Sequence, residues 1–216
     1  LRGPGHHHVV LEDAVRGGGH LLELRESVVN LLRLERSLLG VKGGVGKSTV
    51  SLNLALALSQ TGAKVGLLDA DIYGPSIPLM LGMKDGSMEV EDNKLQPADV
   101  NGLKVVSFGF FADQSNQAAI YRGPIISGIL KQFLVDTNWS ELDYLIVDLP
   151  PGTGDIPLTL AQTIPITGIL VITTPQDVAS NVAVKAVSMF EKLNVPIIGV
   201  IENMSHFICP KCDDKH

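Results

Sequence analysis

The sequence predicts an α/β fold, with a mostly parallel sheet and helices on both of its faces. Two observations lead to this prediction. Short, continuously apolar runs alternate with longer amphipathic segments, and strands that helices cover on both sides carry such runs. A glycine-rich string at residues 42–49 is followed directly by a segment of helical periodicity, as in loops that join a buried strand to a helix. The chain of 216 residues is long enough for one such domain.

Residues 1–40 differ from the rest of the chain. Their beginning is rich in Gly and His, and in residues 21–39 leucines and valines recur at helical spacing among charged residues. We therefore interpret residues 1–40 as an atypical segment, helical or poorly ordered, and residues 41–216 as the globular domain. The histidines at 6–8 are expected to be solvated rather than metal-binding. The acidic residues of the segment argue against a mitochondrial targeting peptide.

From residue 64 onward, short apolar runs predict the strands of the sheet. Strands are expected at 65–68, 103–108, 144–147, 168–173 and 197–201, and helices at about 50–58, 124–135 and 178–193. Gly62 and Pro124 stand where the end and the start of a helix favour these residue types. Residues 82–102 are polar and are expected to form a surface excursion with at most a short hairpin.

Composition argues against several classes of function. The formal net charge of −6 and the pI near 5.4 argue against a general surface for nucleic acid or anionic membranes. No apolar run reaches the roughly 18–20 residues of a membrane-spanning helix. The two cysteines, Cys209 and Cys212, are too few for a disulfide framework, and their spacing indicates metal or redox chemistry in a reducing compartment. We therefore expect a cytoplasmic protein that binds no nucleic acid and does not span a membrane.

The string KGGVGKST at residues 42–49 is typical of a loop that binds the phosphates of a nucleotide. Glycines allow backbone N–H groups to converge on phosphates, and a helix beginning near Lys47 adds the positive end of its dipole. We expect Lys47 to reach the β- and γ-phosphates and the Ser48 hydroxyl to bind Mg²⁺. An ordinary glycine-rich turn before a helix is the alternative.

Val41 departs from the general pattern of such loops. The pattern places a glycine five residues before Gly46, where this sequence has Val41, with Gly40 one position too early. A β-branched residue resists positive φ, and its Cβ would crowd the phosphates. Residues 37–41 are also a poor candidate for the buried strand that should precede the loop. We therefore expect a lower nucleotide affinity than a complete loop would give.

Acidic residues follow two of the expected strands. Asp69 and Asp71 come at the end of the run 65–68, and Asp148 follows the run 144–147. Ligands of parallel sheets bind beyond the carboxyl ends of the strands, at the edge that also carries the glycine-rich loop. Asp148 suits a carboxylate just outside the ligands of Mg²⁺, and Asp71 one that orients the attacking water. An isolated acid at a strand end is more often a cap or turn former, so its position beside the loop is what favours a functional role.

Several strings occur together in one order along the chain. They are KGGVGKST (42–49), LLDADIYGPS (67–76), YRGP (121–124), VDLPPGTGD (147–155), TPQD (174–177), and ENMS (202–205) followed by CPKC (209–212). With these strings, residues 42–216 resemble the Mrp/ApbC-type iron–sulfur cluster carrier ATPases. That family is related to the MinD/ParA and nitrogenase iron-protein group of P-loop NTPases, which have a deviant Walker A loop.

The resemblance implies roles for individual residues. Lys42 would cross a dimer interface to the partner's phosphates and act in catalysis with Asp71 of switch I and Asp148, which begins switch II. The contacts to ATP would come from Gly43, Gly44, Val45, Gly46, Lys47, Ser48, Thr49, Gly152 and Asn203, with Ser48 also binding Mg²⁺ and Asn203 contacting the adenine. Cys209 and Cys212 would be ligands of an iron–sulfur cluster.

The cysteine pair leaves three possibilities open. A [4Fe–4S] cluster normally takes four thiolates, so a cluster would have to bridge the two subunits of a homodimer. A structural zinc, completed by His206 or His216, and a dithiol–disulfide pair are the alternatives. The spacing does not separate cluster from zinc, and the resemblance favours the cluster.

The resemblance implies a scaffold or carrier that assembles a labile [4Fe–4S] cluster and transfers it to apo-proteins, gated by ATP binding and slow hydrolysis. A MinD/ParA-like positioning ATPase with a structural zinc is the main alternative, although the sequence shows no basic patch or C-terminal amphipathic helix to support it. A small-molecule kinase would not need Lys42. Family members have a strand and Ser-Gly before this lysine and continue beyond the position of His216, so we expect a chain truncated at its C-terminus.

Overall fold

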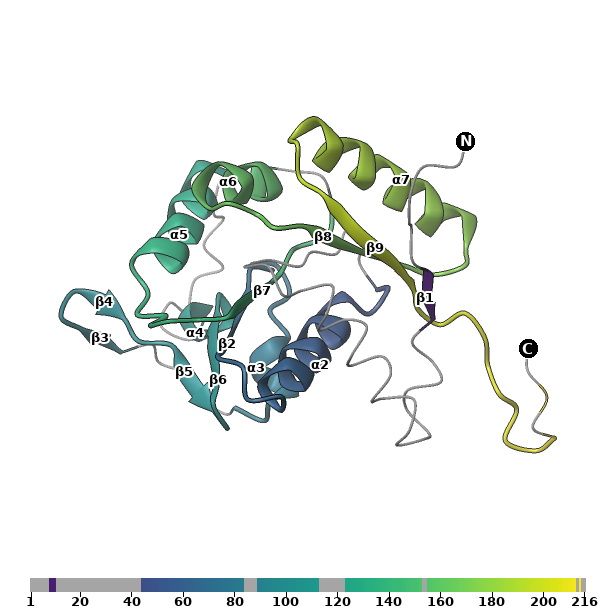
Figure 1. Cartoon of the computed structure of the whole chain (residues 1–216), viewed down its shortest axis with the longest axis horizontal. Helices are drawn as coiled ribbons and strands as arrows, with labels where there is room; N and C mark the ends of the chain where they lie inside the picture. Colours follow the sequence, from purple (N-terminus) through teal and green to yellow (C-terminus); the bar gives the residue numbers. More distant parts are fainter. Residues whose placement is uncertain are drawn as a thin grey trace.

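Two sheets with flanking helices make up the described part of the chain (Figure 1). The computed structural model describes residues 8–10, 44–83, 89–112, 123–152, 155–212 and 214. The first sheet has the order β5-β6-β2-β7, formed by Ala98–Val100, Leu103–Ser107, Val65–Asp69 and Tyr144–Asp148. The second has the order β1-β9-β8, formed by His8–Val10, Ile197–Glu202 and Ile169–Thr173. Apart from β5, which is antiparallel to β6, all neighbouring strands of these two sheets are parallel.

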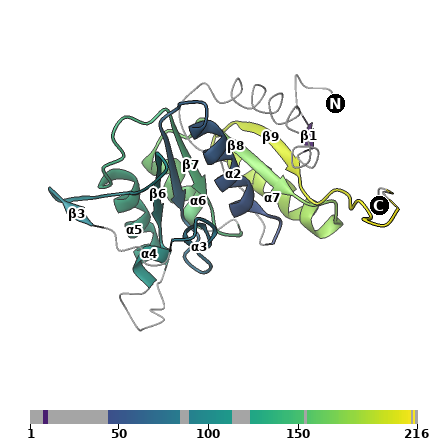
Figure 2. The same ribbon diagram turned by 90° about the horizontal axis from the view of Figure 1, so that it is seen from below.

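Helices cover both faces of the strands, because side chains along each strand alternate between the faces. The helices are α2 (Lys47–Ser59), α3 (Ile77–Met80), α4 (Gly109–Ala112), α5 (Gly123–Val135), α6 (Asp155–Thr163) and α7 (Asp177–Lys192). Leu67 of β2 packs in a core with α2 and α3, whereas Leu68 packs in a second core with α5, α6 and α7. Figure 2 shows α2 and α7 on opposite sides of β8. The predicted fold, a mostly parallel sheet with helices on both faces, is confirmed.

Some elements differ from those that the sequence predicts. The polar excursion contains the hairpin β3 (Val90–Glu91) and β4 (Lys94–Leu95), but β5 extends the first sheet, which we did not predict. Helix α6 and the short strand β1 were not predicted either. β1 pairs in parallel with β9, His8 lying opposite Val200. The helix expected within residues 21–39, the segment 37–41 and Val41 lie outside the described residues.

The parallel strands are divided between two ladders. β7 is the last strand of the first sheet and β8 the last strand of the second, and no described strand hydrogen-bonds to both. Apolar side chains connect the two parts. Val45, in the loop before α2, packs with Ile172 of β8 and Ile201 of β9, and Leu170 of β8 also packs against the core under α2. The glycine-rich loop therefore rests on the second sheet, while its helix packs mainly on the first.

No helix in the described ranges is both long and apolar enough to cross a membrane.

Candidate functional site

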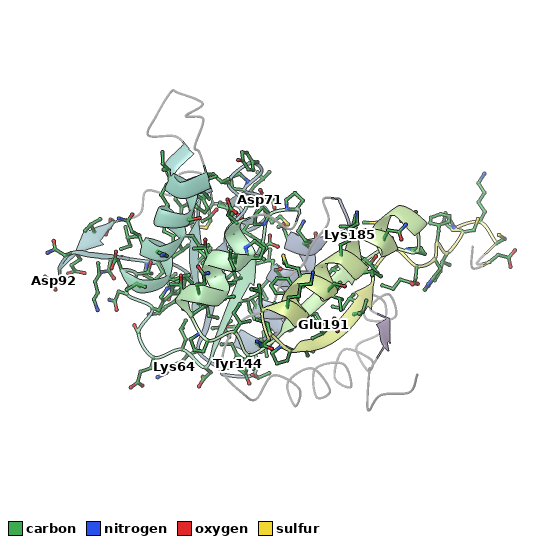
Figure 3. The ribbon with its side chains drawn as sticks, turned by 90° about the horizontal axis from the view of Figure 1, so that it is seen from above. Lys64, Asp71, Asp92, Tyr144, Lys185 and Glu191 are labelled. Atoms are coloured by element: carbon green, nitrogen blue, oxygen red, sulfur yellow. The ribbon has the colours of Figure 1, made fainter. Side chains whose placement is uncertain are left out.

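The structure brings the glycine-rich loop and the acidic strand ends to one edge. In the register of β2 and β7, Asp69 lies opposite Asp148, and the N–H of Ala70 donates to the carbonyl of Asp148 at 2.9 Å. Figure 3 shows Asp71 on the opposite side of the fold from Lys64 and Tyr144, which lie at the beginnings of β2 and β7. The candidate site is thus at the carboxyl ends of the strands, where ligands of parallel sheets bind.

Two glycines set the shape of the loop. Gly44 and Gly46 have φ of 76° and 86°, a backbone conformation that glycine adopts without strain. Gly46 is the N-cap of α2, so no N-cap side chain competes with an anion for the first N–H groups of the helix. A Cβ at Gly46 would overlap the side-chain amide of Asn203. This part of the loop therefore has the backbone geometry that phosphate binding requires.

Lys47 is buried beside two carboxylates. Its side chain is only 6% exposed. Burial lowers the pKa of the Lys47 amine, and the negative charges of Asp148 and Asp71 oppose this by favouring the ammonium form. An anionic phosphate in the loop would add a third favourable charge next to the amine.

Asp148 combines a hydrogen-bonded and an orphaned oxygen. Burial raises the pKa of its carboxyl, and a hydrogen bond with Ser48, the charge of Lys47 and a hydrogen bond with Ser51 oppose this. The hydroxyl of Ser51 donates to Oδ1 at 3.3 Å. The other oxygen, Oδ2, is buried and has no hydrogen-bond partner within the described ranges. A buried carboxylate oxygen beside the Ser48 hydroxyl fits Mg²⁺, which prefers oxygen ligands and keeps several waters.

Asp69 is a residue of the site to which the sequence assigned no role. It is fully buried, and its Oδ2 accepts hydrogen bonds from the Ser107 hydroxyl at 2.9 Å and from the N–H of Ile77 at 3.2 Å. Its Oδ1 accepts from the N–H of Asp71 at 3.2 Å. Asp69 therefore ties both ends of the loop 70–77, which carries Asp71, to the end of β2. The one feature of the sequence that pointed to this role is that Asp69 directly follows the apolar run 65–68.

The pKa of Asp69 predicts how stability depends on pH. Burial, with the nearby charge of Asp148, raises this pKa from 3.8 to about 7, although the hydrogen bonds to Asp69 oppose the shift. Protonation thus favours the folded state, and this stability is lost as the pH rises from about 4 to about 7, on the order of 4 kcal/mol at most. In Asp69→Asn, which cannot ionise, we expect a clearly flatter decline, measured as the free energy of unfolding in urea across this range.

The exposed Glu191, on α7, provides a control for this experiment. Glu191→Gln should leave the pH dependence as it is in the unmodified protein. If the free energy of unfolding of Asp69→Asn falls with pH as steeply as that of the unmodified protein, the titration of Asp69 does not cause the pH dependence.

The cysteine pair lies beyond β9. Cys209 is half-buried, Cys212 is exposed, and both are free thiols. Hydrogen bonds from the backbone of Lys211 and Cys212 lower the pKa of the Cys209 thiol and favour the thiolate, the form that binds metals. Within the described residues, no three or more His, Cys, Asp or Glu side chains are grouped to hold a metal ion. The Nδ1 of His206 lies 3.2 Å from the Ser205 hydroxyl, and its role as a zinc ligand stays the alternative.

Asn203 lies between the two candidate sites. Its side-chain Nδ2 donates to the carbonyl of Val45 at 2.9 Å, and its backbone N–H donates to the carbonyl of Thr173 at 2.8 Å. The contact with the phosphate loop was not predicted, and the contact with adenine stays a prediction.

The remaining predicted residues differ in how they are placed. Thr49 is exposed in the first turn of α2, and its carbonyl accepts a hydrogen bond from Asn53. Gly152 follows β7 with a φ of 107°, which favours glycine. Lys42, Gly43 and His216 lie outside the described residues. The structure thus gathers Lys47, Ser48, Asp71 and Asp148, while their roles stay predictions.

Comparison with known proteins gives matches that cover most of the chain. Residues 37–216 match the family model described as ParA, NUBPL iron-transfer P-loop NTPase. A protein of Aquifex aeolicus named iron–sulfur cluster carrier protein is 53% identical over 176 residues, which are 81% of this chain and 48% of that protein. A protein of the same name from Haemophilus influenzae is 56% identical over 172 residues, 79% of this chain and 46% of its own length. The chain thus spans about half the length of these relatives.

Two solved structures support the fold. A nucleotide-binding protein from Archaeoglobus fulgidus, in complex with ADP, superposes with a TM-score of 0.71 at 38% identity and covers 90% of this chain and 76% of its own. The septum site-determining protein MinD of Pyrococcus horikoshii, complexed with Mg-ADP, has a TM-score of 0.57 at 19% identity, over 78% of this chain and 70% of its own. At this low identity the second match supports the fold alone.

Proposed function

The chain belongs to the ParA family of P-loop NTPases, to the group described as iron-transfer NTPases, and on this premise we propose that it is an ATP-binding scaffold and carrier of iron–sulfur clusters. The observation that carries the proposal is the combination of two features in one chain. The free thiols of Cys209 and Cys212 follow β9, and a loop with the geometry of a phosphate-binding loop lies beside the buried carboxylate of Asp148. A phosphate loop alone would fit many NTPases, and the thiols add the capacity to bind a metal cluster.

In this proposal ATP binds in the loop of residues 42–49. The N–H groups of Gly44, Val45 and Gly46 and the ammonium of Lys47 would hold the phosphates. The Ser48 hydroxyl would bind Mg²⁺, which screens the charge of the phosphates, and Asp148 would lie just outside the ligands of the ion. Asp71, kept in place through Asp69, would orient the water that attacks the γ-phosphate. Lys42 would come from the second subunit, and hydrolysis would be slow and would serve regulation.

The cluster is the cargo of this carrier. Four thiolates are needed for a [4Fe–4S] cluster, and each chain has only Cys209 and Cys212. We therefore propose a homodimer in which the cluster bridges two copies of the cysteine pair and apo iron–sulfur proteins are the recipients. Closely spaced free thiols suit a reducing compartment, so we propose a cytoplasmic location.

Anaerobic reconstitution with iron and sulfide tests the proposal. We expect the absorbance of an iron–sulfur cluster and about four iron atoms per two chains, the content of one shared [4Fe–4S] cluster. Gel filtration should show that the protein becomes dimeric together with the cluster. One tightly bound zinc per chain that iron loading does not displace would instead support the positioning ATPase with a structural zinc.

A further inference from the structure

Ser51 lies outside the glycine-rich string of residues 42–49 and reaches the candidate site from one turn further along α2. Residues four apart in a helix lie on the same face, so Ser51 and Lys47 point to the same side of α2. Both residues are 6% exposed, and both interact with Asp148 at the end of β7. Helix α2 therefore brings a buried hydroxyl, in addition to the Lys47 ammonium, to this carboxylate.

The hydroxyl of Ser51 is committed to Asp148. It donates to Oδ1 at 3.3 Å. A hydroxyl carries one hydrogen, so this bond takes the place of a bond to the carbonyl of the preceding turn, which a serine inside a helix can otherwise make. Ser51 is thus bonded to a strand end that is 97 positions away in the sequence rather than to its own helix.

The bond selects one orientation of the Asp148 carboxylate. The last torsion of an aspartate side chain is broad, so it does not by itself fix the directions of the two oxygens. Because both oxygens are joined rigidly through the carboxyl carbon, holding Oδ1 at Ser51 directs Oδ2 to another side. Asp148 is only 1% exposed, so bulk water cannot take over this task.

The oxygen that is left, Oδ2, is the one without a hydrogen-bond partner in the described parts of the chain. Buried polar atoms of this kind are rare and call for a partner such as a water molecule or an ion. Mg²⁺ keeps several of its waters when it is bound, and such waters donate hydrogen bonds. Ser48 also bonds to Asp148, but its hydroxyl is the proposed ligand of the ion. Ser51 instead holds Asp148 with a hydroxyl that the ion does not need.

We propose that Ser51 is a positioning residue for Mg²⁺: by holding Oδ1 of Asp148, it leaves Oδ2 to accept hydrogen bonds from the waters of the ion. This inference rests on the proposed function, because it assumes that a nucleotide brings Mg²⁺ to the loop. Ser51 itself would touch neither the nucleotide nor the ion. Its loss should therefore affect the ion through Asp148 and leave the contacts to the phosphates in place.

The test measures how tightly the ADP complex binds Mn²⁺, which takes the place of Mg²⁺ at oxygen ligands and can be followed by electron paramagnetic resonance. In Ser51→Ala we expect about tenfold weaker binding of Mn²⁺. This is the lower end of the contribution of a hydrogen bond to a charged group, because the bond is long. The affinity for ADP in EDTA should be unchanged, since the loop and Lys47 would hold the phosphates.

Ser127→Ala is the matched control for the loss of a hydroxyl. It removes the hydroxyl that accepts a hydrogen bond from Thr159 at 3.0 Å, between α5 and α6, and should leave Mn²⁺ binding unchanged. Ser51→Thr and Ser51→Val form a second pair of nearly equal shape, of which only the first keeps the hydroxyl. We expect Ser51→Thr to bind Mn²⁺ about tenfold more tightly than Ser51→Val, because the effect of the added methyl group on packing is common to both.

Two results would overturn the proposal. In the first, Mn²⁺ affinity is the same in the unmodified protein and Ser51→Ala, or the same in Ser51→Thr and Ser51→Val. In the second, Ser51→Ala weakens ADP binding in EDTA as much as it weakens Mn²⁺ binding, which means that Ser51 acts through the shape of the loop. Both results leave the proposed function intact. Failure of the unmodified protein to bind ADP or ATP would overturn the proposed function as well.

Discussion

Replacing Lys47 by alanine is expected to weaken nucleotide binding about thirtyfold or more. The Lys47 ammonium is buried beside Asp148 and Asp71, in the first turn of the helix that follows the phosphate loop. Truncating one partner of a buried, hydrogen-bonded charge pair costs about 2–5 kcal/mol, and each 1.4 kcal/mol is tenfold in affinity. In the variant, the two carboxylates would also face the phosphates without the cation between them. Calorimetric titration with Mg-ATP measures the loss, and circular dichroism verifies the fold.

Lys42 offers a matched comparison, since it is also a lysine of the loop. If it reaches the phosphates of the partner subunit, Lys42→Ala should retain much of the nucleotide affinity and lose hydrolysis, because the charge it would stabilise develops in the transition state. If both variants lose affinity equally, Lys42 is a phosphate ligand within its own subunit. The argument for the dimer would then be weaker.

Replacing either cysteine by alanine is expected to abolish the reconstituted cluster. Cys209→Ala or Cys212→Ala leaves two thiolates in the proposed dimer, and a [4Fe–4S] cluster normally takes four. Because the cluster would join the subunits, the same variants should dimerise more weakly. Absorbance, iron content and sedimentation after anaerobic reconstitution measure the three effects.

His206→Ala is the control that separates cluster from zinc. His206 was the alternative zinc ligand nearest the cysteines, and His206→Ala should retain the full cluster content. Equal metal loss in His206→Ala and Cys209→Ala, with one zinc per chain in the unmodified protein, would contradict the cluster assignment.

The features that could be predicted from the sequence depend on local pattern. The predicted strand 144–147 is confirmed as β7, which ends at Asp148. It could be predicted because a short apolar run between turn residues by itself indicates a buried strand. The family resemblance based on strings such as KGGVGKST is confirmed by the match to residues 37–216. Such strings can be interpreted from the sequence because each specifies a local backbone conformation and its charged groups within a few consecutive residues.

The features that were missed depend on contacts between distant segments. Asp69 resembles Asp71 in the sequence, and only the positions of Ser107 and Ile77 around it distinguish the two carboxylates. The bond between Asn203 and Val45 joins residues 158 positions apart. Strand β1 depends on the free edge of β9, which the histidine-rich sequence before it does not indicate.

The phosphate loop has two supports, Val45 on β8 and β9 and helix α2 mainly on the first sheet, and this arrangement has a mechanical consequence. Backbone hydrogen bonds hold neighbouring strands in register, and sliding one strand along another breaks them together. Between β7 and β8 the described contacts are apolar side chains, whose attraction has no preferred direction. Among the described residues, the loop is thus supported at Val45 and along α2 by contacts of this non-directional kind. Any displacement of β8 and β9 relative to the first sheet would change the curvature of the phosphate loop, because Val45 packs on the former and α2 mainly on the latter.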